Sequence, residues 1–206
     1  MPTDRYLTLK AQAEGKYTEK RSRFLSFAIP VKNEDEAKEE IKKYQKKYYD
    51  ARHVCYAYAL GFDGEQTRAN DAGEPSGTAG RPILGQIRSA GLTFCLVVVV
   101  RYYGGTPLGA ANLGRAYQTA AVEALQLAEK EERTVTTDVS VAVPYTEVDA
   151  VMKIVNDSGA EITARQYEPT EEQLTIAIRL NMEAPLRERL GKIYTLRFLD
   201  PDTAET

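Results

Sequence analysis

Residues 71–82 read DAGEPSGTAGRP, and this stretch decides how the middle of the chain folds. Three glycines and two prolines in twelve residues exclude a strand or a helix interior, because Gly favours irregular backbone and Pro lacks an N–H donor. Pro82 then opens an apolar pattern, with Ile83 and Ile87 on one face, which predicts a helix to about Ser89. Free N–H groups in a glycine-rich loop before a helix form a candidate anion site, and a plain surface loop is the alternative.

Apolar spacing predicts further elements in residues 1–133. Asn33 with Glu36 forms a capping box, so we expect a helix after Asn33 with Ile41 and Tyr44 on its apolar face. A long helix lined by small residues is expected over about 108–132. The expected strands are 6–10, 23–31, 53–62 and 93–103, of which the last two read as buried on both faces. The turn GGTPLGAANLG that follows the last strand matches neither standard nucleotide-binding motif.

The polar segment 129–138 is typical of a domain junction, and we place the boundary between domains 1–133 and 134–206. Beyond it the pattern alternates between strand and helix periods in the order βαββαβ, the split βαβ or ferredoxin-like motif. The expected elements are strand 134–144, helix 145–157, strands 160–167 and 173–180, helix 185–190 and strand 193–199. This domain has no His, Cys or glycine-rich loop, so it is expected to serve in recognition or docking.

Composition indicates a soluble protein that carries no metal or cofactor. Of the 206 residues, 43% are hydrophobic and 28% are charged, which supports a real core. No apolar run of about 18 residues and no apolar signal segment is present, so we expect a cytoplasmic protein without membrane contact. Cys55 and Cys95 are too far apart for a metal or redox motif, and we expect them to be buried, reduced thiols.

Charge is unevenly distributed between the two expected domains. Residues 1–133 carry 20 Lys and Arg against 17 Asp and Glu, whereas residues 134–206 carry 7 against 13. The sequence pI of about 5.4 lies below that of most RNA-binding proteins. The run Lys20-Arg21-Ser22-Arg23 fits a nucleic-acid contact or, equally, a solvated strand end.

One constellation around the loop fits catalysis. His53, the only histidine, is a candidate base, Glu74 or Asp71 could orient it, and Ser76 or Thr78 is a candidate nucleophile. A lone histidine cannot build a usual zinc site, and a structural histidine is the alternative. The pattern favours a role without catalysis.

Five motifs together resemble the YigZ/IMPACT family, in its bacterial two-domain type. They are SRF at 22–24, DARHVCYAY at 50–58, GEPSGTAGRPIL at 73–84, VVVVRYYGG at 97–105 and LGRAY at 113–117. The resemblance implies an α+β chain whose first domain is similar to domain 2 of ribosomal protein S5. It also implies a ferredoxin-like second domain similar to domain V of elongation factor G.

The resemblance implies a translation-associated or regulatory factor that binds RNA or the ribosome through the Gly-rich loop face. The expected binding surface comprises Arg52, His53, Asp71, Glu74, Ser76, Gly77, Thr78, Arg81, Arg101, Tyr102, Gly104, Gly105 and Arg115, and Tyr103 could also stack on a base. A protein-binding regulator without nucleic-acid contact is the alternative. In a third interpretation the two loops close the domain against each other, and Glu74 pairs with Arg101 or Arg81.

Two departures from the family pattern weaken anion binding at the second loop. Pro107 stands where the family usually has Lys, and Ala111-Asn112 stands where it usually has two glycines. The first change removes a cation beside the glycine pair, and the second makes the backbone less able to wrap a phosphate.

Overall fold

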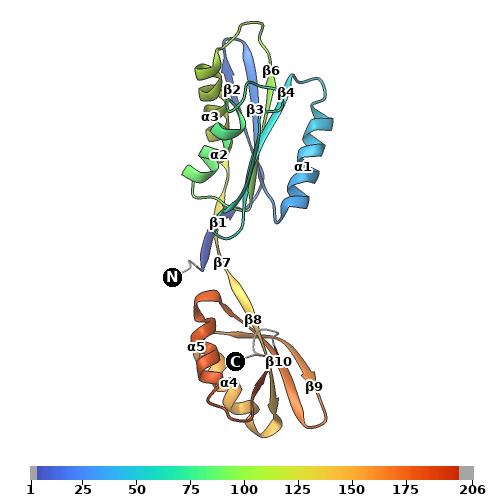
Figure 1. Ribbon diagram of the computed structural model, residues 1–206, viewed down its shortest axis with the longest axis vertical. Helices are drawn as coiled ribbons and strands as arrows, with labels where there is room; N and C mark the ends of the chain where they lie inside the picture. Colours follow the sequence, from blue (N-terminus) through green and yellow to red (C-terminus); the bar gives the residue numbers. More distant parts are fainter. Residues whose placement is uncertain (1–3, 200–206) are drawn as a thin grey trace. The chain divides into compact units, whose positions relative to one another are not determined.

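The computed structural model describes residues 4–199, which form two compact units. The N-terminal unit spans Arg5–Arg133, and the C-terminal unit contains Asp4 and residues 134–199. Each unit combines helices with sheets, so the expected α+β class is confirmed (Figure 1). Within the described residues, no helix has the length and apolar character needed to cross a membrane.

The N-terminal unit is built on a five-stranded sheet in the order β2-β3-β6-β4-β5, in which every neighbouring pair is antiparallel. Strands β1 and β7 form a separate two-stranded sheet. The elements in chain order are β1 (Arg5–Leu9), β2 (Ala13–Glu19), β3 (Ser22–Pro30), α1 (Glu34–Lys47), β4 (His53–Leu60), β5 (Gln66–Asn70), α2 (Gly80–Ser89), β6 (Cys95–Tyr102), α3 (Ala110–Leu127) and β7 (Lys130–Thr134).

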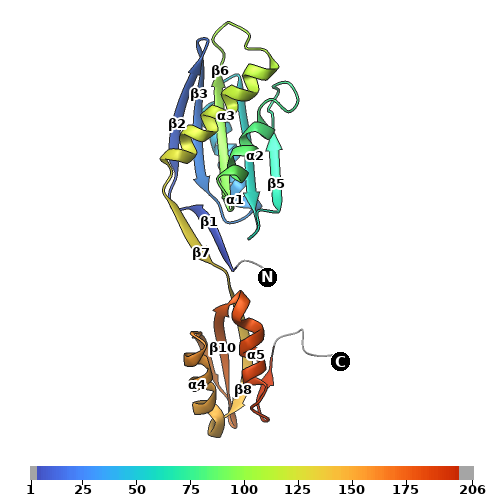
Figure 2. The same ribbon diagram turned by 90° about the vertical axis from the view of Figure 1, so that its left-hand side faces the viewer.

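Helices cover both faces of this sheet. Helix α1 lies on one face, and α2 and α3 lie on the other (Figures 1 and 2). Ile41 and Tyr44 of α1 pack with Val98 of the central strand, whereas Tyr117 of α3 packs with Val97 on the opposite face. Because β6 is buried on both faces, it is apolar from Cys95 to Val100 without alternation, as the sequence predicts.

The first helix begins as its capping pattern predicts. Asn33 Oδ1 accepts a hydrogen bond from Glu36 N at 2.9 Å, and the Glu36 carboxylate accepts one from Lys32 N at 2.7 Å. Acidic residues occupy the first turn, and Lys46 and Lys47 occupy the last, so the charges complement the helix dipole.

Three expectations for this unit are wrong. The last helix ends at Leu127 rather than near residue 132, because Lys130–Thr134 forms β7 and pairs with β1. Strands β2 and β5 were not expected at all. Both are edge strands with mostly exposed or half-buried residues, so neither carries the apolar alternation that marks a strand.

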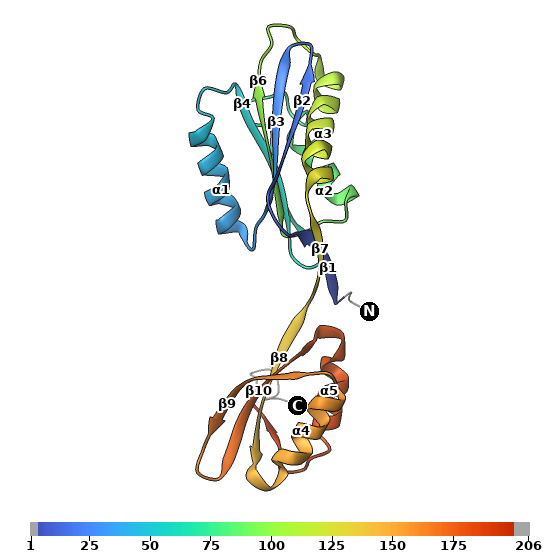
Figure 3. The same ribbon diagram turned by 180° about the vertical axis from the view of Figure 1, so that it is seen from behind.

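The C-terminal unit has the predicted βαββαβ order. Its sheet runs β11-β8-β10-β9, and α4 and α5 lie on one face (Figure 3). The elements are β8 (Thr136–Pro144), a 3₁₀ turn (Tyr145–Glu147), α4 (Val148–Asp157), β9 (Glu161–Tyr167), β10 (Glu171–Arg179), a second 3₁₀ turn (Leu180–Met182), α5 (Glu183–Leu190) and β11 (Arg197–Phe198). The last strand is shorter than predicted, since only Arg197 and Phe198 pair with β8.

Candidate functional site

Asp71 occupies the place where an anion was expected. Its Oδ1 accepts hydrogen bonds from the amides of Ala79 (2.9 Å) and Gly80 (2.8 Å), and its Oδ2 accepts one from the amide of Gly77 (2.8 Å). Burial acts to raise the pKa of Asp71, but the three amides outweigh it and hold that pKa below its ordinary value. The free N–H groups expected before α2 are therefore satisfied by the chain's own carboxylate.

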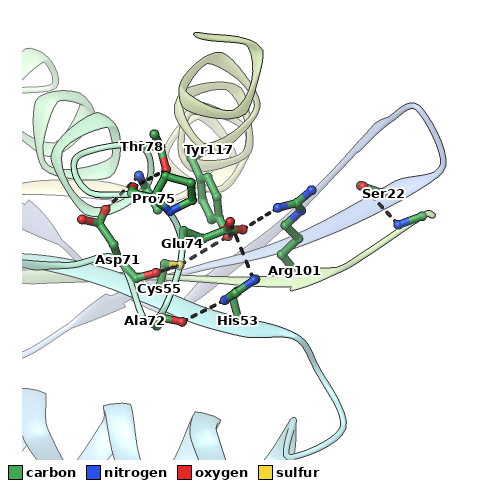
Figure 4. Close-up of polar contacts among 12 residues, drawn as sticks. Ser22, His53, Cys55, Asp71, Ala72, Glu74, Pro75, Thr78, Arg101 and Tyr117 are labelled. Carbon is green, nitrogen blue, oxygen red and sulfur yellow. Dashed lines mark hydrogen bonds and ion pairs between the residues drawn. The ribbon is translucent and has the colours of Figure 1, made fainter. Parts of the chain in front are cut away.

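Glu74 lies at the centre of a buried hydrogen-bond network. Its Oε1 accepts from Arg101 Nη1 at 2.6 Å and from the Tyr117 hydroxyl at 2.8 Å (Figure 4). The Glu74 and Arg101 side chains are only 4% and 7% exposed. We call Asp71, Glu74, Arg101 and Tyr117 the loop cluster. The pairing of Glu74 with Arg101 is the one expected if the two loops close the domain against each other.

His53 is held at the edge of the loop cluster. Its Nδ1 lies 2.8 Å from the carbonyl oxygen of Ala72, which places the proton on Nδ1 because a carbonyl can only accept. The other ring nitrogen, Nε2, lies 3.7 Å from Glu74 Oε2. Ala72 has a left-handed φ of 45°, so the backbone turn that presents its carbonyl to His53 is itself constrained.

Cys55 and Tyr117 close the network beneath the loop. The Cys55 thiol donates to the carbonyl of Asp71 at 3.0 Å and lies 3.3 Å from the Tyr117 hydroxyl. Burial raises the pKa of Cys55 to about 12, and burial also raises the pKa of Tyr117. The thiol therefore stays protonated at neutral pH and is a poor nucleophile.

The loop does not bring its hydroxyl groups to His53. The Thr78 hydroxyl donates to the carbonyl of Pro75 at 2.6 Å, and Ser76 is exposed. In the described part of the chain, no hydrogen bond joins either hydroxyl to His53. Residues 4–199 also contain no group of three or more His, Cys, Asp or Glu side chains placed to hold a metal. This arrangement holds the fold together but assembles no activated nucleophile.

An open, arginine-rich cavity lies at the same end of the sheet. Successive residues of a strand point to opposite faces, so Arg101 enters the loop cluster whereas Tyr102 reaches the other side. There a cavity of about 590 Å³ opens, which we call the arginine pocket. It is lined by Arg21, Arg23, Asp50, Ala51, Arg52, Tyr102 and Tyr103.

The arginine pocket has an excess of positive charge. Among the ion pairs formed within residues 4–199, none involves Arg21, Arg23 or Arg52. Asp50, the single carboxylate of the lining, accepts a hydrogen bond from the Tyr102 hydroxyl at 3.0 Å. Three guanidinium groups without a paired carboxylate repel one another and attract an anion such as phosphate.

The turn between β2 and β3 fixes Arg21 at the rim of the arginine pocket. Lys20 and Arg21 both have left-handed φ angles, of 45° and 66°, as the two central residues of this tight turn. Gly104 passes so close to the turn that a Cβ at position 104 would collide with the backbone of Arg21 and Ser22. Its amide also donates to Ser22 Oγ at 3.2 Å (Figure 4). A glycine is therefore required where β6 meets the turn.

The structure divides the expected binding surface into three groups. Arg52 and Tyr102 line the arginine pocket, together with Tyr103. Residues engaged in or beside the loop cluster are His53, Asp71, Glu74, Gly77, Thr78 and Arg101. Residues that are exposed without lining the pocket are Ser76, Arg81, Gly105 and Arg115, whereas Gly104 supports its rim.

Arg21 and Arg23 were missing from the expected surface. The signal was present in the sequence, because both belong to the basic run at residues 20–23. A solvated strand end explained that run equally well, and only the packing of the β2–β3 turn against the end of β6 brings it beside Arg52.

Comparison with known proteins places this geometry in a family. The model of the Impact N-terminal domain matches residues 20–125, which contain both the loop cluster and the arginine pocket. An IMPACT family member in the pol 5′ region of Thermus thermophilus is 38% identical over 165 residues, covering 80% of this chain and 85% of that protein.

Two further relatives bear on the extent of the likeness. IMPACT family member YvyE of Bacillus subtilis strain 168 is 42% identical over 120 residues, or 58% of this chain, and the match spans only 55% of that relative's length. A crystal structure of a hypothetical protein aligns over 98% of this chain and 99% of that one, with a TM-score of 0.71 and 27% identity. The alignment with this crystal structure therefore covers both units of the chain.

Proposed function

The chain belongs to the IMPACT family, and we propose that it is a cytoplasmic, translation-associated regulatory factor that binds RNA through the arginine pocket. The observation that carries this proposal is the set of three arginines without carboxylate partners beside two tyrosines. Arginine binds phosphate through charge-assisted hydrogen bonds, and tyrosine offers a ring for base stacking.

The acidic pI does not oppose this function, because the charges are segregated. Residues 1–133 carry a net charge of +3, whereas residues 134–206 carry −6. The arginine pocket belongs to the N-terminal unit, so RNA would meet the basic part of the chain. The C-terminal unit would then present a negative surface, which disfavours contact with RNA.

The test is the salt dependence of RNA binding by the full chain. Binding of ribosomal RNA fragments and tRNA is measured in filter assays between 50 and 200 mM salt, where about one counterion is released per phosphate contact. We expect binding to weaken steeply with salt. The double variant Arg21→Glu/Arg52→Glu should bind more than about tenfold more weakly and show a salt slope smaller by about two.

Arg68→Glu/Arg88→Glu is the matched control, because it makes the same change in charge and both arginines are exposed in the same unit and line other cavities. It should leave both the affinity and the salt slope close to the wild-type values. Absent binding, binding that ignores salt, or an equal loss in the control and in Arg21→Glu/Arg52→Glu would contradict the proposal.

A second candidate function, protein docking, is favoured by an aromatic cluster elsewhere in the N-terminal unit. Tyr6, Phe62 and Phe94 have ring centroids 5.0 to 5.7 Å apart beside a cavity of about 440 Å³. Phe62 is 49% exposed, and Phe94 has a left-handed φ of 51°, which is rare for a bulky residue. Capture of one stoichiometric protein after nuclease treatment, and its loss in Phe62→Ser, would favour docking over RNA binding.

A further inference from the structure

The two tyrosines of the arginine pocket are not equivalent. Tyr102 is already engaged, because the Arg23 guanidinium lies 5.0 Å from its ring centroid and its hydroxyl is bound to Asp50. Tyr103 is 49% exposed. The Arg101 guanidinium lies 5.6 Å from its ring centroid, and Arg101 is in turn held by Glu74. Tyr103 is therefore a ring that is anchored through the loop cluster and still has surface for a ligand.

Three guanidinium groups line one cavity, where they can bind the phosphates of a strand. The backbone of Arg21 is held at the rim by the packing of its turn against Gly104. Arg52 directly precedes β4 and lines the same cavity. Arg23 is braced by Tyr102, so its position is also restricted. The side chains of Arg21 and Arg52 are exposed and have no carboxylate partner among the described residues, so both are available to phosphate oxygens.

The exposed tyrosine ring in the pocket favours an unpaired base over a duplex. The cavity, of about 590 Å³, is open to solvent and large enough to receive one nucleotide. Bases inside an A-form duplex are stacked on each other and cannot reach a tyrosine ring in a cavity. An unpaired base can leave the stack and enter.

We infer that the arginine pocket binds one unpaired nucleotide of a single-stranded RNA segment, with its base on Tyr103 and its flanking phosphates on Arg21 and Arg52. This inference rests on the proposed function and names the form of RNA that the same site selects. A duplex offers the arginines its phosphates but leaves Tyr103 without a base.

The test compares two forms of one RNA on the full chain. A labelled 12-nucleotide single strand and its blunt duplex are titrated by fluorescence anisotropy at one salt concentration. We expect the strand to bind at least about tenfold more tightly than the duplex, and Tyr103→Leu to weaken strand binding by about 5- to 100-fold without changing duplex binding.

Two variants separate stacking from other effects of the substitution. Tyr103→Phe keeps the ring and should bind the strand within about twofold of wild type. Tyr194→Leu is the matched control, since Tyr194 is fully exposed in the C-terminal unit, and it should change nothing. The strand-to-duplex comparison uses the wild-type protein, so it holds even if a variant fails to fold.

The outcomes distinguish this inference from the function on which it rests. Equal binding of strand and duplex, with Tyr103→Leu unchanged, overturns single-strand selection and leaves RNA binding in place. Competition by a free mononucleotide at the affinity of the strand also overturns it, because the ligand would then be a nucleotide and not a chain. Absence of binding to either RNA removes both proposals.

Discussion

Arg101 and Tyr102 are neighbours on β6, but their side chains belong to opposite faces of the sheet. Arg101 is 7% exposed and hydrogen-bonded to Glu74 in the loop cluster. Tyr102 lines the arginine pocket, where Arg21 and Arg52 have no carboxylate partner among the described residues. The buried pair of Arg101 with Glu74 stabilises the fold, although Arg101 Nε has no hydrogen-bond partner among the described residues, whereas exposed arginines without a carboxylate partner are available to a ligand. The difference assigns stability to the loop cluster and phosphate binding to the arginine pocket, and Tyr103, whose ring packs on Arg101, connects the two.

The largest expected effect is the loss of the buried ion pair. Arg101→Met leaves Glu74 buried without its cation, which should lower the free energy of unfolding by about 3–5 kcal/mol in urea titrations. Adding Glu74→Gln to Arg101→Met removes the stranded charge and should recover part of the loss. A loss below about 1 kcal/mol would show that the loop cluster is not a stabilising element.

The next effect concerns the carboxylate that caps α2. Asp71→Asn leaves one oxygen to serve three amides and should cost about 2–3 kcal/mol. Because the pKa of Asp71 is lowered in the fold, its contribution is present above the unfolded value of about 3.9 and is lost as pH falls through the folded pKa.

The pH dependence gives this prediction its control. The free energy of unfolding of the wild type should therefore fall below about pH 4. In urea titrations across pH, Asp71→Asn should show a smaller fall over the same pH range. Asp35→Asn changes an exposed carboxylate on α1 and should leave the fall in unfolding free energy at low pH unchanged. If the unfolding free energy of Asp71→Asn fell below about pH 4 as much as that of the wild type, the amides would not stabilise the ionised carboxylate.

A substitution at Gly104 should lower both the stability of the fold and the affinity for RNA. Gly104→Ala drives a Cβ into the backbone of the β2–β3 turn, so we expect a loss of about 2 kcal/mol and weaker RNA binding as Arg21 moves. Gly105→Ala meets no atom within 4 Å but strains a φ of 86°, and it should cost about 1 kcal/mol with RNA binding unchanged. Equal RNA affinities of Gly104→Ala and Gly105→Ala would show that the packing of the β2–β3 turn does not control RNA binding at the arginine pocket.

Sequence patterns predicted the elements that bury many apolar residues and missed those that bury few. The start of α1 was predicted from the capping pair Asn33–Glu36, and β6 was predicted from its apolar run, because each signal is local in the sequence. Edge strands β2 and β5 give no such signal: burial alternates along β2, but its more buried positions include Gly15 and Glu19, and β5 is mostly exposed. The pairing of Glu74 with Arg101 was one of two partners anticipated for Glu74.

The arginine pocket and the capping role of Asp71 depend on contacts between distant segments. Arg52 and Tyr102 were expected in the binding surface, yet Arg21 joins them only because a turn about 80 residues earlier packs against Gly104. Asp71 was assigned to a ligand surface, since nothing in the sequence indicates that its carboxylate folds back onto the amides of residues 77–80.

The smallest expected effect is a gain. Lys20 has a left-handed φ of 45° in the β2–β3 turn, a conformation that Asn adopts more readily. Lys20→Asn should raise the free energy of unfolding by about 0.5 kcal/mol while keeping Arg21 in place. A stability loss in urea titrations would mean that the Lys20 side chain makes a contact that outweighs its backbone strain.

The most direct test measures unfolding free energy and RNA affinity together in one pair of variants. Arg21→Glu/Arg52→Glu should keep its stability within about 0.5 kcal/mol of wild type and lose RNA affinity by more than about tenfold. Glu74→Gln should lose stability, while its folded fraction keeps the wild-type salt slope of RNA binding, because Arg21 and Arg52 are unchanged. Its RNA affinity should fall less than that of the double arginine variant, since only the anchoring of Tyr103 through Arg101 is loosened. The reverse pattern, with binding lost in Glu74→Gln and kept in the double arginine variant, would contradict the assignment of stability to the loop cluster and phosphate binding to the arginine pocket.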